Sequence, residues 1–358
     1  MTHRLSKTLV RGLLLAAAFM GAHAQAQSQT AAPRALKVLI ITMFEPEAQP
    51  WIEPLKLDQK LPVVGLLPES PALRCNADDV CLLTAGMGHA NVAASTLAVA
   101  LDPQFDLRRT YFLIAGIAGI DPAQGTIGSA AWARWLVDFG IAHELDSRDK
   151  PKGWATGYYG IMTPGPGQKP KLEYHTEVAR VDEALLQKAL ALSRNAKLAD
   201  SDKARAYRAN YGGKNGGKYS RSPASRPPSV IQCDTLGGDT WWHGDKLGEH
   251  ARAWTKLMTD GQGVYCTTQQ EDNATQNALA RAAAAGKVDL KRLAVLRTGS
   301  NFDRPYPGQS AQASLKASTT GATGGFVPAT QNLYNVGGLL VRDIVANWAQ
   351  WRDGVPPL

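Results

Sequence analysis

The chain has 358 residues, of which 44% are apolar and 20% are charged, and its formal net charge is +8. These proportions are typical of a globular protein with one large or two modest domains, and they exclude an intrinsically disordered chain. The lysines and arginines are scattered and form no long run, so the positive charge does not indicate a nucleic-acid partner.

Residues 1–26 predict a secretory signal peptide. Three basic residues precede the apolar stretch 12–22, and small-residue sites for signal peptidase follow at 22–24 and 24–26. We therefore expect one domain over 27–358, exported to the periplasm or the cell exterior. No later segment approaches the roughly 20 uninterrupted apolar residues that a membrane-spanning helix needs. The sequence thus argues against a pore or carrier formed by this chain alone.

The four cysteines gain meaning from the predicted export, because an oxidising compartment favours disulfide bonds. Cys75 and Cys81 flank the polar turn NADDV, a span suited to a short closed loop. Pairing them leaves Cys233 for Cys266, although four cysteines allow three connectivities and all three stay open. No CxxC motif or His/Cys spacing predicts a metal site, and no motif predicts a cofactor.

The first predicted strand leads to the first catalytic candidate. Residues 38–43 (VLIITM) form an apolar run without a charge, typical of a parallel strand buried on both faces. Glu45 and Glu47 follow, separated by Pro46. Ligands of α/β sheets bind beyond the carboxyl ends of the strands, so we expect Glu47 to point into a cleft. The alternative is a solvated acid in a loop or at a helix N-terminus.

Two further strands lead into glycine-rich segments. Residues 80–85 run into a turn at Gly86, and residues 111–115 end in a loop that contains Gly116 and Gly119. Small residues there let a ligand approach the backbone, although the same glycines also suit tight turns and close packing. The other predicted elements are helices at 51–57, 90–101, 177–193, 245–259, 274–285 and 332–351, and strands at 128–137, 230–233, 264–268 and 293–297.

Residues 147–229 differ from the rest of the chain in composition. Glycine and proline cluster at both ends of this segment, around one predicted helix. We interpret the segment as an insertion, partly loop, that forms a lid over the cleft.

The last two core strands also end in polar groups. Residues 264–268 lead into Gln269–Glu271 (QQE) at the start of a helix, and residues 293–297 lead into 298–303 (TGSNFD). Strands that alternate with helices predict an α/β layer architecture. Several polar strand ends at one sheet edge predict a small-molecule site.

The order and spacing of these motifs resemble the nucleoside phosphorylase superfamily, and within it the methylthioadenosine nucleosidases and the purine nucleoside permease family. The likeness to the permease family covers nearly the whole chain after the signal peptide, and its most specific pieces are LLTAGMGHANVAAS, CTTQQEDN and LRTGSNFDRPYPG. The likeness to the nucleosidases is confined to the strand ends. The resemblance implies a nucleoside phosphorylase-like three-layer sandwich with a mixed central sheet, a loop-rich insertion, and purine nucleosides as ligands.

The nucleosidase pattern implies a role for each matching residue. Glu47 matches the acid that activates water in those enzymes. Gln270 and Glu271 match the end of their ribose-binding Glu-Met-Glu segment, so Glu271 would hold the sugar hydroxyls. Arg297 and Ser300 match the base-reading segment, and Arg297 would help to position the attacking water.

Two departures from that pattern affect the expected chemistry. Asn301 replaces the acid that protonates purine N7, and an amide donates a hydrogen bond but is no general acid. Either Asp303 supplies the proton, or Asn301 favours 6-oxopurines by pairing with O6 and N7. Ile114 and Ile117 stand where the phosphorylases carry the arginine and serine that bind phosphate, and a phosphate site without cations is hard to build.

The sequence therefore names a catalytic set and a binding set. The catalytic candidates are Glu47, Arg297 and Asp303. The substrate-binding candidates are Phe44, Gly86, Gly116, Ile117, Gln270, Glu271, Ser300 and Asn301. Stacking of the base on an aromatic side chain is also expected, and the candidates for it are Phe44, Tyr158, Tyr159, Trp242 and Phe302.

Two classes of function fit these residues. The first is an exported purine nucleosidase, which releases base and ribose with water as the attacking group. The second is a protein that captures nucleosides without turnover for a separate membrane transporter, as the permease name implies. A purine nucleoside phosphorylase is a third, enzymatic alternative. Members of the superfamily often self-associate, so a homo-oligomer is consistent with the resemblance.

Overall fold

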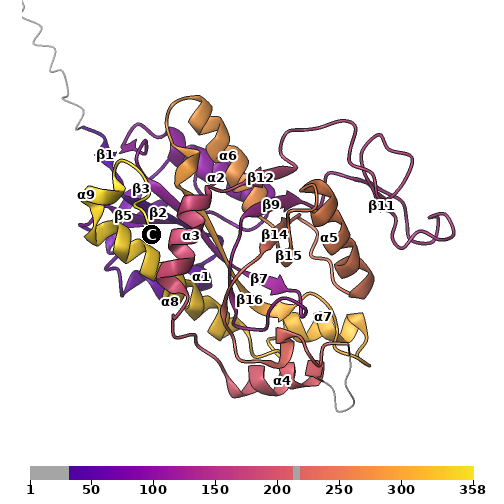
Figure 1. Ribbon diagram of the computed structural model, residues 1–358. Coiled ribbons are helices and arrows are strands. Elements are labelled where there is room, and N and C mark those ends of the chain that lie inside the picture. Colours follow the sequence, from indigo (N-terminus) through magenta and orange to yellow (C-terminus); the bar gives the residue numbers. More distant parts are fainter. Residues whose placement is uncertain (1–31, 213–217) are drawn as a thin grey trace, which may run out of the picture. The chain divides into compact units, whose positions relative to one another are not determined.

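A mixed sheet of twelve strands forms the centre of the part of the chain that the computed structural model describes, residues 32–212 and 218–358 (Figure 1). The sheet contains β2 (Val38–Thr42), β3 (Gln59–Pro62), β4 (Ala72–Cys75), β5 (Val80–Thr84), β7 (Tyr111–Ile120), β8 (Ala130–Trp132), β9 (Trp135–Asp138), β12 (Val178–Arg180), β13 (Val230–Gln232), β14 (Asp234–Gly237), β15 (Tyr265–Gln269) and β16 (Leu293–Phe302). Two short pairs stand apart from it, β1 (Arg34–Ala35) with β6 (Phe105–Asp106) and β10 (His143–Glu144) with β11 (Tyr158–Tyr159). The predicted signal peptide lies outside the described residues.

Helices cover both faces of this sheet. They are α1 (Glu45–Ile52), α2 (His89–Leu101), α3 (Glu183–Ser193), α4 (Asp202–Gly212), α5 (Asp245–Met258), α6 (Asp272–Ala284), α7 (Ala311–Thr319), α8 (Phe326–Ala346) and α9 (Trp348–Trp351). One layer contains α1, α3 and α8, and α2 packs against α6 in the other (Figure 1). Strands β5 and β7 both pair with β2 in parallel, on its two sides. Right-handed crossovers in opposite directions place α1 and α2 on opposite faces. The predicted three-layer α/β class is confirmed.

The two longest strands, β7 and β16, are longer than the sequence predicted. They pair in parallel along almost their whole length, with Arg297 opposite Gly116 and Phe302 opposite Ile120. The predicted loop at Gly116–Gly119 is therefore wrong, and the strand predicted at 293–297 continues to 302, because this ladder supplies hydrogen bonds to the backbone of both segments. As a result, the strand ends that carry the polar residues are rigid parts of the sheet.

Helix α1 begins earlier than predicted. The sequence placed a helix at 51–57, but α1 begins at Glu45, with two residues between it and the end of β2, and ends at Ile52. Pro46 stands in the first turn, where a helix needs no backbone N–H donor. Glu47 therefore lies in the first turn of a helix that directly follows the strand, and its direction is fixed by both elements.

The segment 147–229 contributes to the main layers. Residues 178–180 form β12 and pair with β9, so the helix predicted from 177 begins only at Glu183, capped by Asp182. Helix α3 then packs against α8, and α4 is a second helix of this segment, for which only one helix was predicted. The predicted strand 128–137 divides into β8 and β9. None of the described residues of 147–229 lines the cavity presented below, so their role as a lid stays a prediction.

Near the C-terminus, α7 was not predicted, and the last long helix begins at 326 rather than 332. Two disulfides join Cys75 to Cys81 and Cys233 to Cys266. The first links β4 to β5, and the second ties the segment between β13 and β14 to β15. In the described ranges we find no helix with both the length and the apolar character to cross a membrane.

Candidate functional site

A cavity of about 330 Å³ lies beside residues 117–119 of β7, residues 268–269 of β15 and residues 297–301 of β16. Its other described lining residues come from the segment that links β2 to α1, from α1, from the glycine turn before α2, from the loop between β14 and α5, from the start of α6, and from α7 and α8. They are Met43, Phe44, Glu47, Met87, Ile117, Ala118, Gly119, Thr240, Trp241, Thr268, Gln269, Gln270, Glu271, Arg297, Ser300, Asn301, Ser318, Thr319 and Phe326. The structure thus brings together segments up to nearly 300 residues apart in the sequence.

Eight residues predicted from the sequence line this cavity. They are Phe44, Glu47, Ile117, Gln270, Glu271, Arg297, Ser300 and Asn301. Gly86, Gly116 and Asp303 do not line it, and each has a different structural role, which is described below. The volume is large enough for a small organic ligand of the size of a nucleoside.

Glu47 lies at the inner wall of the cavity and is 1% exposed. Its Oε1 accepts a hydrogen bond from the Ile117 backbone N–H (2.7 Å), and its Oε2 accepts one from the Met43 N–H (2.8 Å). Burial raises the pKa of Glu47 to about 7, partly opposed by the nearby Arg297 and reinforced by the negative charge of Glu271. A carboxyl group with that pKa is suited to accept a proton near neutral pH.

Arg297 is the centre of a buried ion cluster behind this carboxylate. The guanidinium is paired with Asp272 (2.6 Å) and Glu271 (3.0 Å), and Nη1 donates to the Ile117 carbonyl oxygen (3.0 Å). Burial alone would lower the pKa of Arg297, but Asp272 and Glu271 together raise it, so the group stays charged. The sequence analysis missed Asp272. Its position directly after Glu271, at the start of a helix, was the available signal.

Gly116 provides the space for this guanidinium. A Cβ atom at position 116 would overlap Arg297 Nη1, and it would lie 2.9 Å from Cζ and 3.0 Å from the sulfur of Met43. The sequence left two roles open for Gly116, ligand approach to the backbone and close packing. The position of the Arg297 guanidinium favours close packing.

We expect Gly116→Ala to displace Arg297 and to lower the free energy of unfolding by about 1–3 kcal/mol, as overpacking of a buried site does. Ligand binding should weaken at least tenfold, because a displaced Arg297 no longer holds the Glu271 carboxylate in position. Denaturant unfolding and ligand titration would measure both effects. Gly140→Ala is the matched control, since the nearest atom to its added Cβ is 3.7 Å away. Wild-type ligand binding in Gly116→Ala would contradict the assignment.

Glu271 stands at the N-terminus of α6 with its carboxylate toward the cavity. Its Oε1 accepts from the Gly88 N–H (3.3 Å), and Oε2 accepts from the Gln270 N–H (3.1 Å). The Gln269 side chain caps the same helix by accepting from the backbone N–H groups of Glu271 and Asp272. The carboxylate oxygens retain lone pairs for further donors, such as the hydroxyl groups of a sugar.

Ser300 and Asn301 form the wall contributed by β16. The Ser300 hydroxyl donates to Asn301 Oδ1 (3.0 Å), and Asn301 Nδ2 donates to the Phe302 carbonyl oxygen (2.9 Å). These two bonds fix the orientation of the amide, so Asn301 presents one donor edge and one acceptor edge. An amide held in this way can read a heterocycle by paired hydrogen bonds.

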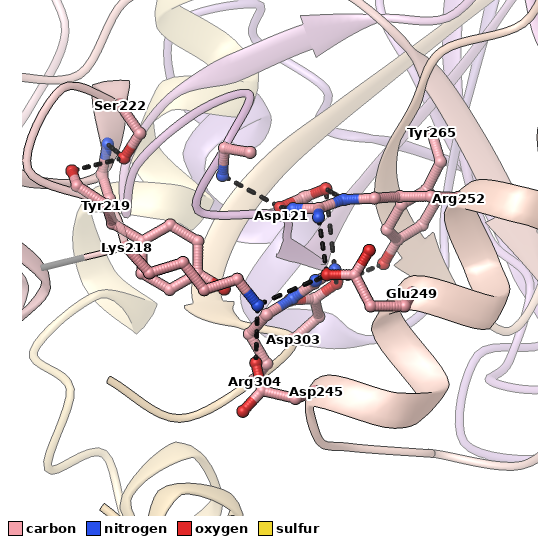
Figure 2. A network of polar contacts seen from close by, with 12 residues as sticks. Asp121, Lys218, Tyr219, Ser222, Asp245, Glu249, Arg252, Tyr265, Asp303 and Arg304 are labelled. Atoms are coloured by element: carbon pink, nitrogen blue, oxygen red, sulfur yellow. Dashed lines mark hydrogen bonds and ion pairs between the residues drawn. The ribbon is translucent and has the colours of Figure 1, made fainter. Parts of the chain in front are cut away.

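Asp303, in contrast, is not among the described lining residues of the cavity and belongs to a buried charge network, which Figure 2 shows. Its carboxylate pairs with Arg304 through two bonds (2.7 and 2.8 Å) and accepts from the Tyr265 hydroxyl (2.7 Å). Asp121 and Arg252 extend the network. Burial raises the pKa of Asp303, against the effect of Arg304. Asp303 is not among the described lining residues and its charge is paired with Arg304, so this geometry gives no support to the prediction that Asp303 supplies a proton to a ligand.

Gly86 is also a structural residue. Its φ of +93° is a conformation that side chains rarely adopt, and an added Cβ would crowd Asn91. The cavity-lining residue of this turn is its neighbour Met87, which was not among the site residues predicted from the sequence. The positive φ of Gly86 favours the tight-turn role that the sequence had left open for it.

Of the aromatic candidates, Phe44 lines the cavity, where its ring lies 6.1 Å from that of Phe326. The other four do not. Tyr158 and Tyr159 line a second cavity beside α5. Trp242 stacks on Phe139, and Phe302 packs against Tyr211 in a core cluster. The sequence analysis missed Trp241 and Phe326, which lie at the cavity but carry no distinguishing motif.

Comparison with known proteins now adds to this geometry. Residues 35–356 match the family described as purine nucleoside permease. The chain belongs to the purine nucleoside permease family. A probable purine nucleoside permease of Schizosaccharomyces pombe is 36% identical over 328 residues, which cover 88% of this chain and 90% of that one. A purine nucleoside permease of Candida albicans is 35% identical over 316 residues, 87% and 75% of the two chains. The resemblance inferred from the sequence motifs is confirmed.

Two solved structures share the fold of this permease-family chain. The native futalosine hydrolase of Helicobacter pylori superposes with a TM-score of 0.50 at 14% identity, over 86% of this chain and 98% of that one. The methylthioadenosine/S-adenosylhomocysteine nucleosidase of the same organism gives a TM-score of 0.51 at 13% identity, over 86% and 99%. At such identities the likeness shows the fold and nothing further.

Proposed function

We propose that this member of the purine nucleoside permease family binds purine nucleosides and hydrolyses their N-glycosidic bond to release base and ribose. The observation that carries the proposal is the buried carboxyl group of Glu47, which lines the cavity beside Glu271 and Arg297. A carboxylate that is ionised near neutral pH can orient and deprotonate a water molecule for attack on the anomeric carbon.

The charge of the cavity supports glycoside cleavage. Glu47 and Glu271 line it and Asp272 lies directly behind Arg297, so three carboxylates surround one guanidinium. N-glycoside cleavage passes through an oxocarbenium-like state, in which the sugar becomes positive. An excess of fixed negative charge stabilises that state more than the neutral nucleoside.

Each of the remaining polar residues has a proposed role with the substrate. Glu271 accepts hydrogen bonds from the ribose hydroxyls, and Phe44 supplies an apolar surface for the base. Asn301 pairs with the base through its fixed amide, which suits the O6 and N7 atoms of a 6-oxopurine. No general acid is assigned to the leaving base, because Asp303 does not line the cavity and is paired with Arg304.

Water rather than phosphate is the proposed attacking group. Arg297 is the single basic side chain among the described lining residues, and Glu271 and Asp272 already neutralise it. Ile117, at the position where phosphorylases bind phosphate, contributes an apolar side chain. A phosphate dianion would meet more negative than positive charge here, which disfavours its binding.

Capture of nucleosides without turnover is the second candidate. The observation that favours it is the naming of the relatives from Schizosaccharomyces pombe and Candida albicans as purine nucleoside permeases. Export is part of either proposal, since two disulfides accord with an oxidising compartment and with the signal peptide predicted from the sequence.

The test is release of free base from inosine and adenosine by the purified protein, with and without added phosphate. We expect equal release in both conditions, with inosine preferred. Release that requires phosphate would identify a phosphorylase instead. Saturable binding of inosine without any release would favour the capture role. If the protein neither binds nor cleaves any of a panel of purine nucleosides, the proposal is overturned altogether.

A further inference from the structure

Three carboxylates lie near Arg297, those of Glu47, Glu271 and Asp272, and Asp272 makes most of the contacts with it. Within the described residues its ion pairs are with Asp272 at 2.6 Å and Glu271 at 3.0 Å. Nε donates to both oxygens of Asp272 (3.1 and 3.3 Å), and Nη2 donates to Oδ1. Asp272 thus accepts hydrogen bonds from two nitrogens of the guanidinium, whereas Glu271 accepts from one. Two-point contacts of this kind fix orientation as well as charge.

Glu47 is satisfied in a different way. Its two oxygens accept from the backbone N–H groups of Ile117 and Met43, which are neutral donors. The carboxyl group therefore keeps remaining lone pairs for water without being an ion-pair partner. A guanidinium bound directly to it would stabilise the anion and make it a weaker base.

We propose that Asp272 is a positioning residue. It holds Arg297 away from Glu47, so that Glu47 remains available to water and Glu271 keeps acceptor capacity for a ligand. Asp272 is fully buried and does not line the cavity, so it acts through Arg297 and does not touch the ligand. The kinetic consequences rest on the proposed hydrolysis, whereas the placement of Arg297 does not.

Burial makes this role strict. Asp272 and Arg297 are 0% and 1% exposed. Neither water nor an ion from solution can therefore reach the site to take the place of a missing charge partner. Without the Asp272 charge, the nearest anions left for the guanidinium are Glu271 and Glu47. The other charged groups around Glu47 are few: Arg297 from β16, Glu271 from the start of α6, and the exposed Glu45 of its own helix.

The test is a pH titration of Glu47 in wild type and in Asp272→Asn. The titration is monitored by carbon NMR of protein that is labelled at the glutamate carboxyl carbon. The Glu47 resonance is assigned by its absence in Glu47→Gln. We expect Asp272→Asn to lower the titration midpoint of Glu47 by roughly one pH unit, as closer pairing with a cation does. In the hydrolysis assay, the acid limb of the kcat/KM profile should move by the same amount, and KM should rise severalfold.

Two further variants separate this role from general loss of a buried ion pair. Asp121→Asn removes another fully buried aspartate with a two-point arginine contact, to Arg252, outside the cavity. It should destabilise the fold but leave the Glu47 midpoint unchanged. Asp272→Glu retains the charge and should keep the midpoint near that of wild type. It also serves as the deciding variant if Asp272→Asn does not fold, since a shift in Asp272→Glu as large as one unit would overturn the proposal.

An unchanged Glu47 midpoint in folded Asp272→Asn would equally overturn it. Absence of turnover in wild type would count against the proposed hydrolysis and leave the NMR result to decide the role of Asp272. The two failures are therefore distinguishable.

Discussion

Glu47→Gln is expected to lower kcat for inosine hydrolysis by about 10²–10⁴-fold, the usual contribution of a general base. The amide retains the size of the side chain and one acceptor oxygen, but it takes up no proton. Nucleoside binding should persist, because neither Glu271 nor Asn301 is changed. Steady-state kinetics together with isothermal titration would separate the two effects.

The pH dependence gives a second readout of the same residue. Burial raises the pKa of Glu47 to about 7, and only the ionised form accepts a proton. Activity should therefore be low below pH 6, rise through pH 7 and level off above it. Residual activity in Glu47→Gln should lack this limb. Glu45→Gln, an exposed carboxylate in the same helical turn, is the matched control and should behave as wild type. Full activity in Glu47→Gln would remove this residue from the mechanism.

Glu271→Gln is expected to lower kcat/KM by about 10²–10⁴-fold. The carboxylate is proposed to accept hydrogen bonds from two ribose hydroxyls, and each bond to a charged group contributes about 1.5–3 kcal/mol. The change also leaves Arg297 with one anion fewer, so thermal unfolding should be followed in parallel. Glu53→Gln, an exposed carboxylate just after α1, is the control for the chemical change itself.

Deoxynucleosides sharpen this second test. If Glu271 contacts the hydroxyls, wild type should lose activity on 2′-deoxyinosine, whereas Glu271→Gln should lose little more on passing from inosine to 2′-deoxyinosine. Such non-additivity is the signature of groups that interact directly. Equal losses in both proteins would place Glu271 elsewhere, as a charge partner of Arg297 alone.

Much of the site could be predicted from the sequence because the end of a buried strand is visible as the point where an apolar run gives way to polar residues. An apolar run that stops at Glu47, and another that stops before Gln269–Glu271, indicate both the strand and the edge at which it ends. The motif order then placed Arg297 and Asn301 at the same edge. Eight of the predicted residues line one cavity, although the sequence does not show the direction in which each side chain points.

The misassigned residues take their roles from tertiary contacts. Asp303 and Asn301 are two residues apart, yet Asp303 pairs with Arg304 in a buried network and Asn301 lines the cavity. Arg304 directly follows Asp303 in the sequence, but the burial of this pair and its contacts with Tyr265 and Asp121 come from distant segments. Gly116 was predicted to approach a ligand, but an arginine 181 positions later occupies the space beside it. In both cases the deciding contacts are distant in the chain, so local pattern carries no information about them. Trp241 and Phe326 were missed for the same reason.

By itself the sequence determined the α/β class, the family, and the carboxylate that follows the first strand, because hydrophobic runs and motif spacing are local features of the chain. Only the tertiary structure decided which carboxylate holds Arg297. The pairing of β7 with β16 brings Gly116 opposite Arg297, and burial there makes ion pairing obligatory. Whether a charged group serves as a base or as a partner is set by what lies within a few ångströms of it, which the fold creates.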